Sequence, residues 1–144
     1  MNFEVESFVG VGPIKLCMSR KDVQKIMAGN DVEDFKRSSS SELPSDYYCD
    51  VGVFVYYDNS ECVAALEFHE PAHLLFHGNE ILKMPAEMAY RLISGLDTEV
   101  EIDGDGVTSF NLGVGFYAPN YEENPKAPIE SMMVFRKDYY NNQD

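Results

Sequence analysis

One stretch near the start of the chain places apolar residues at the spacing of one helical face. Val23, Ile26 and Met27 occupy positions i, i+3 and i+4, and Ser19 stands where a helix cap is needed. We therefore predict a short amphipathic helix over residues 20–28.

Strand patterns dominate the centre of the chain. Residues 52–57 and 62–68 are rich in β-branched and aromatic side chains and flank the turn-forming residues 58–60. They predict a β-hairpin, and a second group of strands is expected to begin near residues 74–76. The polar residues 30–46, which include four consecutive serines, are expected to form a mobile connection.

The order of helix and hairpin recurs later in the chain. Residues 84–95 span the same length from Met to Gly as residues 18–29, residues 113–117 echo the first hairpin strand, and residues 130–135 echo the second. A degenerate tandem repeat and a chance likeness both remain open at this point. Either way, the fold class predicted is α+β, an antiparallel sheet with short helices packed on one face.

Composition narrows the classes of function. The 144 residues are 44% hydrophobic, enough for one domain over 1–144 with its own core. The chain carries 25 acidic and 11 basic residues, a net charge of -14. Such a charge repels nucleic acids and anionic membranes, and no apolar run reaches the roughly 20 residues of a spanning helix. A basic protein is the partner that this charge favours, although acidity alone can serve solubility.

The three cysteines are an odd set without C-x-x-C spacing: Cys17, Cys49 and Cys62. This pattern argues against a disulfide framework and against a cysteine-rich zinc site. No Lys or Arg precedes Lys15, which is unlike a secretory signal. We therefore expect a cytoplasmic protein without a cofactor.

One motif offers an enzymatic alternative. His69, Glu70 and His73 satisfy the H-E-x-x-H pattern of zinc proteases, and His77 could add a ligand. That chemistry needs a helix through both histidines, whereas Pro71 disfavours one. A strand end followed by a turn is the simpler interpretation. A small metal-binding protein or hydrolase based on these histidines stays the alternative hypothesis.

No other catalytic arrangement stands out. The segment of residues 103–106 resembles the start of a calcium loop, but Asp-Gly pairs also suit a tight turn between strands, which we predict here. There is neither a G-x-S-x-G elbow nor a phosphate-binding glycine loop. We therefore expect a binding protein and not an enzyme.

Acidic residues alternate with other residues over positions 97–105. If this segment is extended, its carboxylates share one face, opposite Val100 and Ile102. We call these five residues the acidic comb: Asp97, Glu99, Glu101, Asp103 and Asp105. A comb of this kind suits a partner's groove rich in Lys and Arg, or it protects an edge strand from aggregation.

A second acidic segment contains an aromatic residue. Tyr121 precedes Glu122 and Glu123, and tyrosine beside carboxylates is a composition that protein interfaces favour. Together with the acidic comb, these residues are the candidate partner-binding set.

Several segments resemble one bacterial family. The residues that carry the likeness are the segments 12–23, 52–57, 66–68, 113–120 and 134–136. Together they are similar to immunity proteins of polymorphic-toxin and contact-dependent growth inhibition systems. Cys17 departs from the pattern, because the family usually has glycine there. The resemblance implies a cytoplasmic protein that neutralises a cognate toxin domain, often a nuclease, in a 1:1 complex.

The arrangement of helix and hairpin also resembles the fold shared by β-lactamase inhibitor protein and BamE-type lipoproteins. Those proteins are exported, so their partners are not carried over, and a BamE-like assembly module is a third possibility. The leading hypothesis is an immunity protein whose carboxylates take the place of phosphates and block the basic active-site cleft of an RNase toxin.

Overall fold

The structure is a computed structural model that describes residues 2–35 and 45–140. In this part of the chain, the fold is α+β, as predicted. The elements follow in chain order: β1 (Asn2–Glu6), β2 (Gly10–Val11), β3 (Ile14–Lys15), α1 (Arg20–Ile26), β4 (Glu33–Phe35), β5 (Ser45–Tyr48), β6 (Val53–Tyr57), β7 (Val63–Phe68), β8 (His73–Phe76), β9 (Asn79–Glu80), the 3₁₀ helix η1 (Ile81–Lys83), α2 (Ala86–Leu96), β10 (Glu101–Ile102), β11 (Gly106–Ser109), β12 (Val114–Tyr117) and β13 (Ser131–Phe135).

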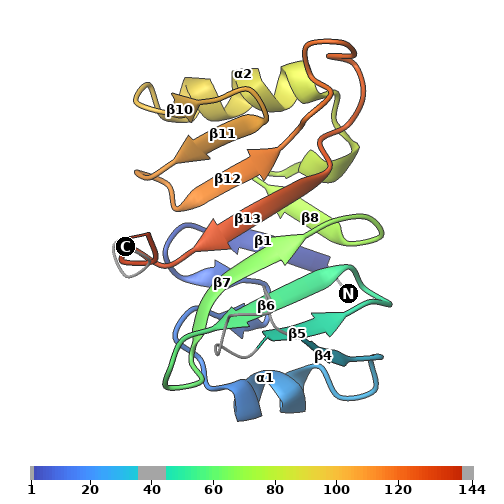
Figure 1. The fold of residues 1–144 in the computed structure, drawn as a ribbon, viewed down its shortest axis with the longest axis vertical. Helices are drawn as coiled ribbons and strands as arrows, with labels where there is room; N and C mark the ends of the chain where they lie inside the picture. The colour runs from blue at the N-terminus through green and yellow to red at the C-terminus, as the bar shows by residue number, and fades with distance from the viewer. Residues whose placement is uncertain (1, 36–44, 141–144) are drawn as a thin grey trace.

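The strands form a large sheet and a small one (Figure 1). The large sheet has eight antiparallel strands in the order β10-β11-β12-β13-β7-β6-β5-β4. The small sheet has the order β3-β2-β1-β8-β9, and β1 pairs with β8 in parallel. The predicted hairpin is confirmed as β6 and β7, and the strand predicted near residues 74–76 is β8.

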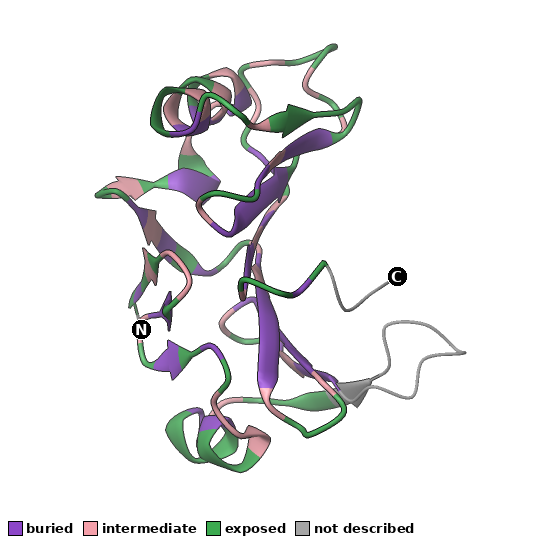
Figure 2. Ribbon diagram, turned by 90° about the vertical axis from the view of Figure 1, so that its left-hand side faces the viewer, coloured by how far each residue is buried: buried purple, intermediate pink, exposed green. Residues whose placement is uncertain are grey.

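Both helices and the small sheet lie on one side of the large sheet (Figure 2). This arrangement confirms the prediction of helices against one face. The other side of the large sheet carries no helix among the described residues, and we call it the open face. It faces the viewer in Figure 1.

The core lies between the large sheet and the layer behind it. In β6, Val53, Val55 and Tyr57 point into this core and are buried, whereas Phe54 and Tyr56 alternate to the open face. Phe3 of the small sheet packs against Phe68 of β7, with ring centroids 5.2 Å apart. Burial of these apolar residues stabilises the two-layer arrangement.

Helix α1 begins where the sequence predicts. The Ser19 side chain accepts a hydrogen bond from the backbone N–H of Asp22 at 3.1 Å, as an N-cap does. Val23 and Met27 are buried, while Ile26 is partly exposed. The helix ends at Ile26, two residues before the expected boundary, and a turn leads on to Gly29.

The recurring order of helix and strands noted in the sequence is present in the structure. Each half consists of a helix and four antiparallel strands, and the last strands of the two halves, β7 and β13, pair at the centre of the sheet. The backbone N–H of Arg20, at the start of α1, donates to Glu61 O at 2.8 Å. The N–H of Ala86, at the start of α2, donates to Ala127 O at the same distance.

The two halves also share a turn. In the first half, Gly52 has a φ of 71° and its N–H donates to Tyr48 O. In the second, Gly113 has a φ of 70° and its N–H donates to Ser109 O. Both distances are 2.9 Å, so the halves match in geometry as well as in element order.

Two expectations require correction. The connection predicted over residues 30–46 contains strand residues at both ends, in β4 and β5, and its residues 36–44 lie outside the described part of the chain. The strands of the small sheet before α1 were not predicted. They are short, and β1 has its partner β8 far along the chain, so local patterning carries little signal for them.

Candidate protein-binding face

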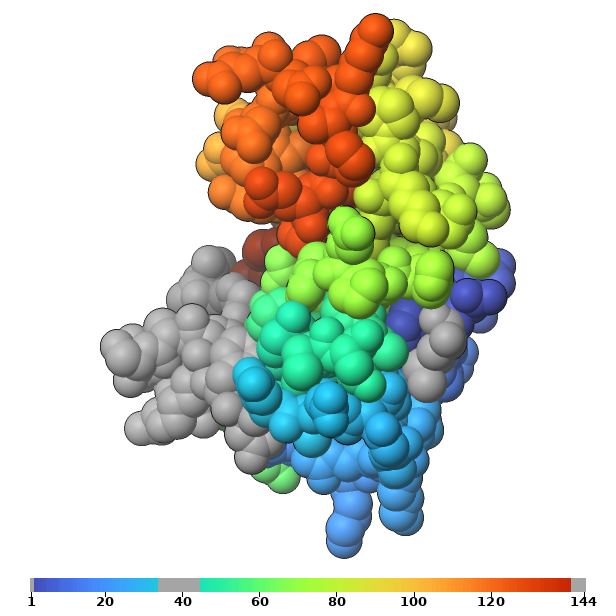
Figure 3. All heavy atoms as spheres, turned by 90° about the vertical axis from the view of Figure 1, so that its right-hand side faces the viewer, coloured from blue at the N-terminus to red at the C-terminus, as the bar shows by residue number. Residues whose placement is uncertain are grey.

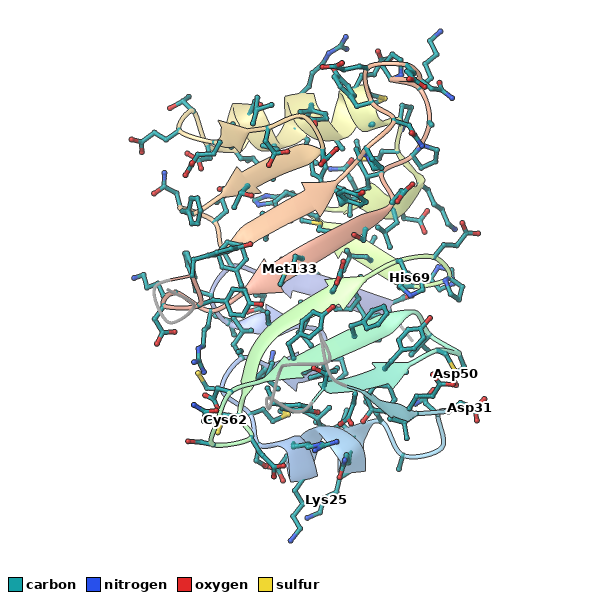
Figure 4. The ribbon with its side chains drawn as sticks, in the orientation of Figure 1. Lys25, Asp31, Asp50, Cys62, His69 and Met133 are labelled. Carbon is teal, nitrogen blue, oxygen red and sulfur yellow. The ribbon has the colours of Figure 1, made fainter. Side chains whose placement is uncertain are left out.

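The open face is defined by the strand register. One row of residues crosses all eight strands and points away from the helices. The row runs Glu33, Tyr47, Phe54, Glu67, Met133, Gly115, Thr108 and Glu101. Met133 marks the middle of this face in Figure 4. The described strands place no Lys or Arg side chain on the open face.

Aromatic rings cover the part of the open face on β5 and β6. The rings of Tyr47 and Phe54 stack with centroids 4.1 Å apart. His69, at the end of β7, lies 5.6 Å from the Tyr47 ring and 5.5 Å from the Phe54 ring. All three side chains are half-buried, so this cluster presents apolar area at the surface.

Hydrogen bonds fix the His69 ring in this cluster. Its Nδ1 lies 2.6 Å from the carbonyl oxygen of Glu70, which can only accept, so Nδ1 carries the proton. In the neutral ring, Nε2 then accepts a hydrogen bond from the Tyr47 hydroxyl at 3.0 Å. Burial, followed by the nearby Cys49 and Glu33, raises the pKa of Tyr47, which keeps this hydroxyl protonated as a donor.

A second aromatic cluster lies on the open face at the end of the central strand β13. Phe135 of β13 contacts Tyr139 and Tyr140, with ring centroids at 6.0 and 4.9 Å. Phe110, in the turn between β11 and β12, lies 5.3 Å from the Tyr140 ring. Phe110 and Tyr140 are exposed, so apolar surface is available on both sides of the sheet centre.

Glu67 of the central strand β7 lies between the two clusters. Its Oε1 accepts a hydrogen bond from the Tyr56 hydroxyl at 2.5 Å, and its Oε2 accepts one from the Ser131 hydroxyl at 3.0 Å. Two cavities, of about 140 and 640 Å³, share Glu67, Tyr117 and Ser131 in their walls. The centre of the face is therefore hollowed around a half-buried carboxylate.

The larger cavity extends from Glu67 past the end of β7 to the segment that leads into β13. Its walls include three carboxylates, those of Glu67, Glu70 and Glu130. Figure 3 shows this side of the molecule, where the light-green segment after β7 lies below the orange segment that leads into β13. A surface of this charge favours cationic groups.

The acidic comb does not form one extended strand. Only Glu101 and Ile102 are strand residues, in β10, and Ile102 is 62% exposed at the sheet edge. Asp97 ends α2 and Asp103 lies in the turn to β11. The prediction that five carboxylates share one strand face is therefore wrong, because the segments on both sides of β10 are not extended strand.

Asp97 is the member of the comb that is buried, with an exposure of 5%. Its carboxylate accepts hydrogen bonds from Asn111 Nδ2 at 2.9 Å, Ser109 Oγ at 2.7 Å and the backbone N–H of Glu99 at 2.9 Å. These bonds, from Asn111 first, hold the pKa of Asp97 below its usual value. Asp97 therefore stabilises the end of α2 and offers a partner little surface.

The rest of the comb is exposed along the β10–β11 edge: Glu99, Glu101, Asp103 and Asp105. Asp103 also accepts backbone hydrogen bonds from Asp105 at 2.7 Å and Gly106 at 2.9 Å. This arrangement confirms the tight turn predicted for residues 103–106. The acidic edge adjoins the open face through Glu101.

The loop between β12 and β13 holds the other candidates. Tyr121 is half-buried against Tyr90 of α2, with ring centroids 4.3 Å apart, so it packs mainly on the helix side. Glu122 and Glu123 are exposed in the same loop. Tyr121 is therefore part of the packing against α2, whereas the carboxylates of Glu122 and Glu123 lie at the surface.

The H-E-x-x-H motif forms a strand end and a turn, as predicted. β7 ends at Phe68, the N–H of Ala72 donates to His69 O at 2.9 Å, and β8 begins at His73. His73 lies 3.9 Å from Glu80, and His77 is in the turn after β8. Over residues 2–35 and 45–140, no three His, Cys, Asp or Glu side chains are grouped so that they could hold a metal ion.

A search of the described helices finds none with the length and hydropathy needed to cross a membrane. Comparisons of the chain with protein-family models, with curated proteins and with solved structures found no significant match. The resemblance to toxin-immunity proteins therefore stays a prediction.

Sequence reasoning missed the open face as a candidate site. Its residues come from strands in both halves, and their common face depends on the pairing of β7 with β13. A local signal did exist in β6, where Phe54 and Tyr56 alternate with Val53 and Val55. Large aromatic residues on the side opposite the valines indicate a second apolar face, on which Tyr56 is buried and Phe54 is half-buried.

Proposed function

We propose that the protein binds a basic protein domain through its open face and neutralises it, as an immunity protein neutralises its cognate toxin. The observation that carries this proposal is the combination of two aromatic clusters and a central carboxylate on one sheet face. No Lys or Arg from the described strands accompanies them. Aromatic area supplies binding energy at interface centres, and carboxylates select a cationic partner.

The charge of the whole chain supports the same kind of partner. A net charge of -14 attracts a basic domain over a distance of about 8 Å at physiological ionic strength. The exposed edge of Glu99, Glu101, Asp103 and Asp105 extends this field beyond the open face. Such charges raise association rates more than they raise final affinity.

Inhibition would follow from substrate exclusion. A nuclease toxin, such as an RNase, binds the phosphates of its substrate with Lys and Arg side chains. Carboxylates docked against those cations compete with the substrate and leave the toxin's catalytic groups intact. The complex would be 1:1 and would form in the cytoplasm, where such a toxin finds RNA.

The test uses gene order, because an immunity gene is expected to lie directly after the gene of its toxin. The toxin domain from the adjacent upstream reading frame is purified and its RNase activity is titrated with this protein. We expect stoichiometric inhibition by the wild type and at least tenfold weaker inhibition by Tyr117→Lys, which places a cation on the open face, where Tyr117 is 45% exposed.

Met88→Lys is the matched control. Met88 is 47% exposed, but it belongs to α2 on the other side of the sheet. It should inhibit like the wild type. If Tyr117→Lys inhibited the toxin as strongly as Met88→Lys and the wild type, the open face would not be part of the interface. If the wild type did not inhibit the toxin, the proposal would be refuted.

A further inference from the structure

The smaller cavity of the open face lies over Gly115. This residue of β12 stands in register between Thr108 of β11 and Met133 of β13, and it has no side chain to fill the space above it. The cavity holds about 140 Å³. Its walls around Gly115 include Glu67, Thr108, Tyr117, Ser131 and Met133.

Glu67 is the charged residue in these walls. Its two hydrogen bonds come from hydroxyl groups, those of Tyr56 and Ser131, which neutralise no charge. A carboxylate offers about four acceptor positions, so about two remain. Within the part of the chain that the structure describes, no ion pair reaches Glu67, and the half-buried charge is uncompensated.

We propose that this cavity is a socket for one lysine or arginine side chain of the protein partner. We call it the Glu67 socket. The side chain's apolar stem would lie against Met133 and its cationic head would meet the Glu67 carboxylate. The ring of Tyr117, which is 45% exposed, offers aromatic contact to the same cation. This inference rests on the proposed function, because it assigns a specific contact to the same face.

The dimensions fit one extended side chain. A volume of about 140 Å³ equals several water molecules at roughly 30 Å³ each, which suits a single long side chain. The larger cavity shares three of the walls, so the backbone that carries this side chain can continue along it, past Glu130 and Glu70. The larger cavity would therefore hold the partner's residues next to this lysine or arginine.

Small peptides test the socket directly. The ¹⁵N-labelled protein is titrated with acetyl-Gly-Lys-Gly-amide and acetyl-Gly-Arg-Gly-amide, with acetyl-Gly-norleucine-Gly-amide as the neutral probe. We expect saturable amide shifts at Gly115, Ser131 and Met133 for the cationic peptides. The neutral peptide should bind at least tenfold more weakly, because it cannot donate a charge-assisted hydrogen bond to the Glu67 carboxylate.

Three variants locate the site. Glu67→Gln keeps the shape and acceptor of the side chain but removes its charge, and it should weaken binding of the lysine peptide about tenfold or more. Thr108→Phe leaves Glu67 unchanged and fills the opposite wall, so it should weaken binding as well. Glu4→Gln removes an exposed charge from β1, behind the large sheet, and should have no effect.

The outcomes separate the socket from the proposed function. Three outcomes would each overturn the socket. They are amide shifts confined to the β10–β11 edge, no shifts at millimolar peptide, and unchanged peptide binding by folded Glu67→Gln and Thr108→Phe. Inhibition of the toxin that still depends on Tyr117 would then leave the function standing. Conversely, peptide binding at Gly115 without inhibition of any toxin would refute the function alone.

Discussion

The two halves of the molecule share one backbone pattern but attach their helices to the sheet by different chemistry. In the first half, the fully buried carboxylate of Asp46 in β5 meets Arg20 of α1, with Oδ1 2.7 Å from Nη2 and Oδ2 3.2 Å from Nε. The hydroxyl of Tyr57 also donates to Asp46, at 3.1 Å. Burial, and then the nearby Asp46 charge, raises the pKa of Tyr57, so this hydroxyl stays a donor.

In the second half, the corresponding positions are apolar. Val107 stands two residues before the second turn, as Asp46 stands before the first, and Ala86 takes the place of Arg20 at the helix start. Both are buried. The polar contact in this half is made by Asp97, whose hydrogen bonds link the carboxyl end of α2 to Ser109 and Asn111. Backbone register therefore sets the fold, whereas the contact between helix and sheet accepts either an ion pair or apolar packing.

The largest expected effect comes from breaking the ion pair of the first half. Asp46→Ala should lower the free energy of unfolding by about 3–5 kcal/mol, because it removes the buried carboxylate that pairs with the largely buried Arg20, and the Glu61 carboxylate 3.4 Å away is exposed. Urea denaturation monitored by circular dichroism measures this change.

A double variant sharpens the result. Asp46→Leu combined with Arg20→Met makes the first half apolar like the second, and it should recover most of the stability that Asp46→Ala loses. A loss below about 1 kcal/mol for Asp46→Ala would mean that the ion pair does not hold α1 to the sheet.

Local signals predicted helix α1 and the four central strands of the large sheet, β12, β13, β7 and β6. The cap at Ser19, the buried Val23 and the hairpin of β6 and β7 each depend on residues close in sequence. The small sheet depends on the parallel pairing of β1 with β8, which no local pattern specifies. The recurring order of helix and strands could be seen in the sequence, whereas the matched hydrogen bonds of the two halves depend on the folded backbone.

The candidate site was harder to predict. The acidic comb followed from charge alternation alone, and Asp97 turned out to be a buried helix-end residue. The open face needs the register that brings Glu67, Met133 and Gly115 into one row across three strands. This row exists only because distant strands pair in one register. The sequence shows the alternation within each strand but not which strands lie side by side.

The equivalent turns give the next effect in size. Gly52→Ala should destabilise the protein by about 3 kcal/mol, because an alanine at a left-handed φ costs about 1–2 kcal/mol and its Cβ would lie 2.3 Å from the backbone oxygen of His69.

Gly113→Ala should cost less, about 2 kcal/mol, although its φ is nearly the same. Its Cβ would meet the Phe8 ring at 2.7 Å, which can move, and Phe135 O at 2.9 Å. Thermal and urea denaturation of both variants test the order. A larger loss for Gly113→Ala would show that the turns are not equivalent in packing.

The smallest effect concerns the segment before each helix. Before α2 this segment is the 3₁₀ helix η1, whereas before α1 it is a bulge in which Cys17 N–H donates to Val63 O and Val63 N–H donates to Met18 O, both at 2.8 Å. Cys17 has a φ of 69°, which disfavours any residue with a Cβ, and its side chain is exposed. Cys17→Gly should therefore raise the free energy of unfolding by up to about 1 kcal/mol, after the greater freedom of glycine in the unfolded chain is subtracted.

Cys17→Ala is the control, because it removes the thiol and keeps the Cβ. It should leave stability within about 0.5 kcal/mol of the wild type. A gain for Cys17→Gly over Cys17→Ala would assign the difference to the left-handed backbone at this position, and would explain in physical terms why glycine suits it. Equal stability of the two variants would mean that the bulge relaxes around the Cβ, and the difference between the two helix starts would then carry no energetic cost.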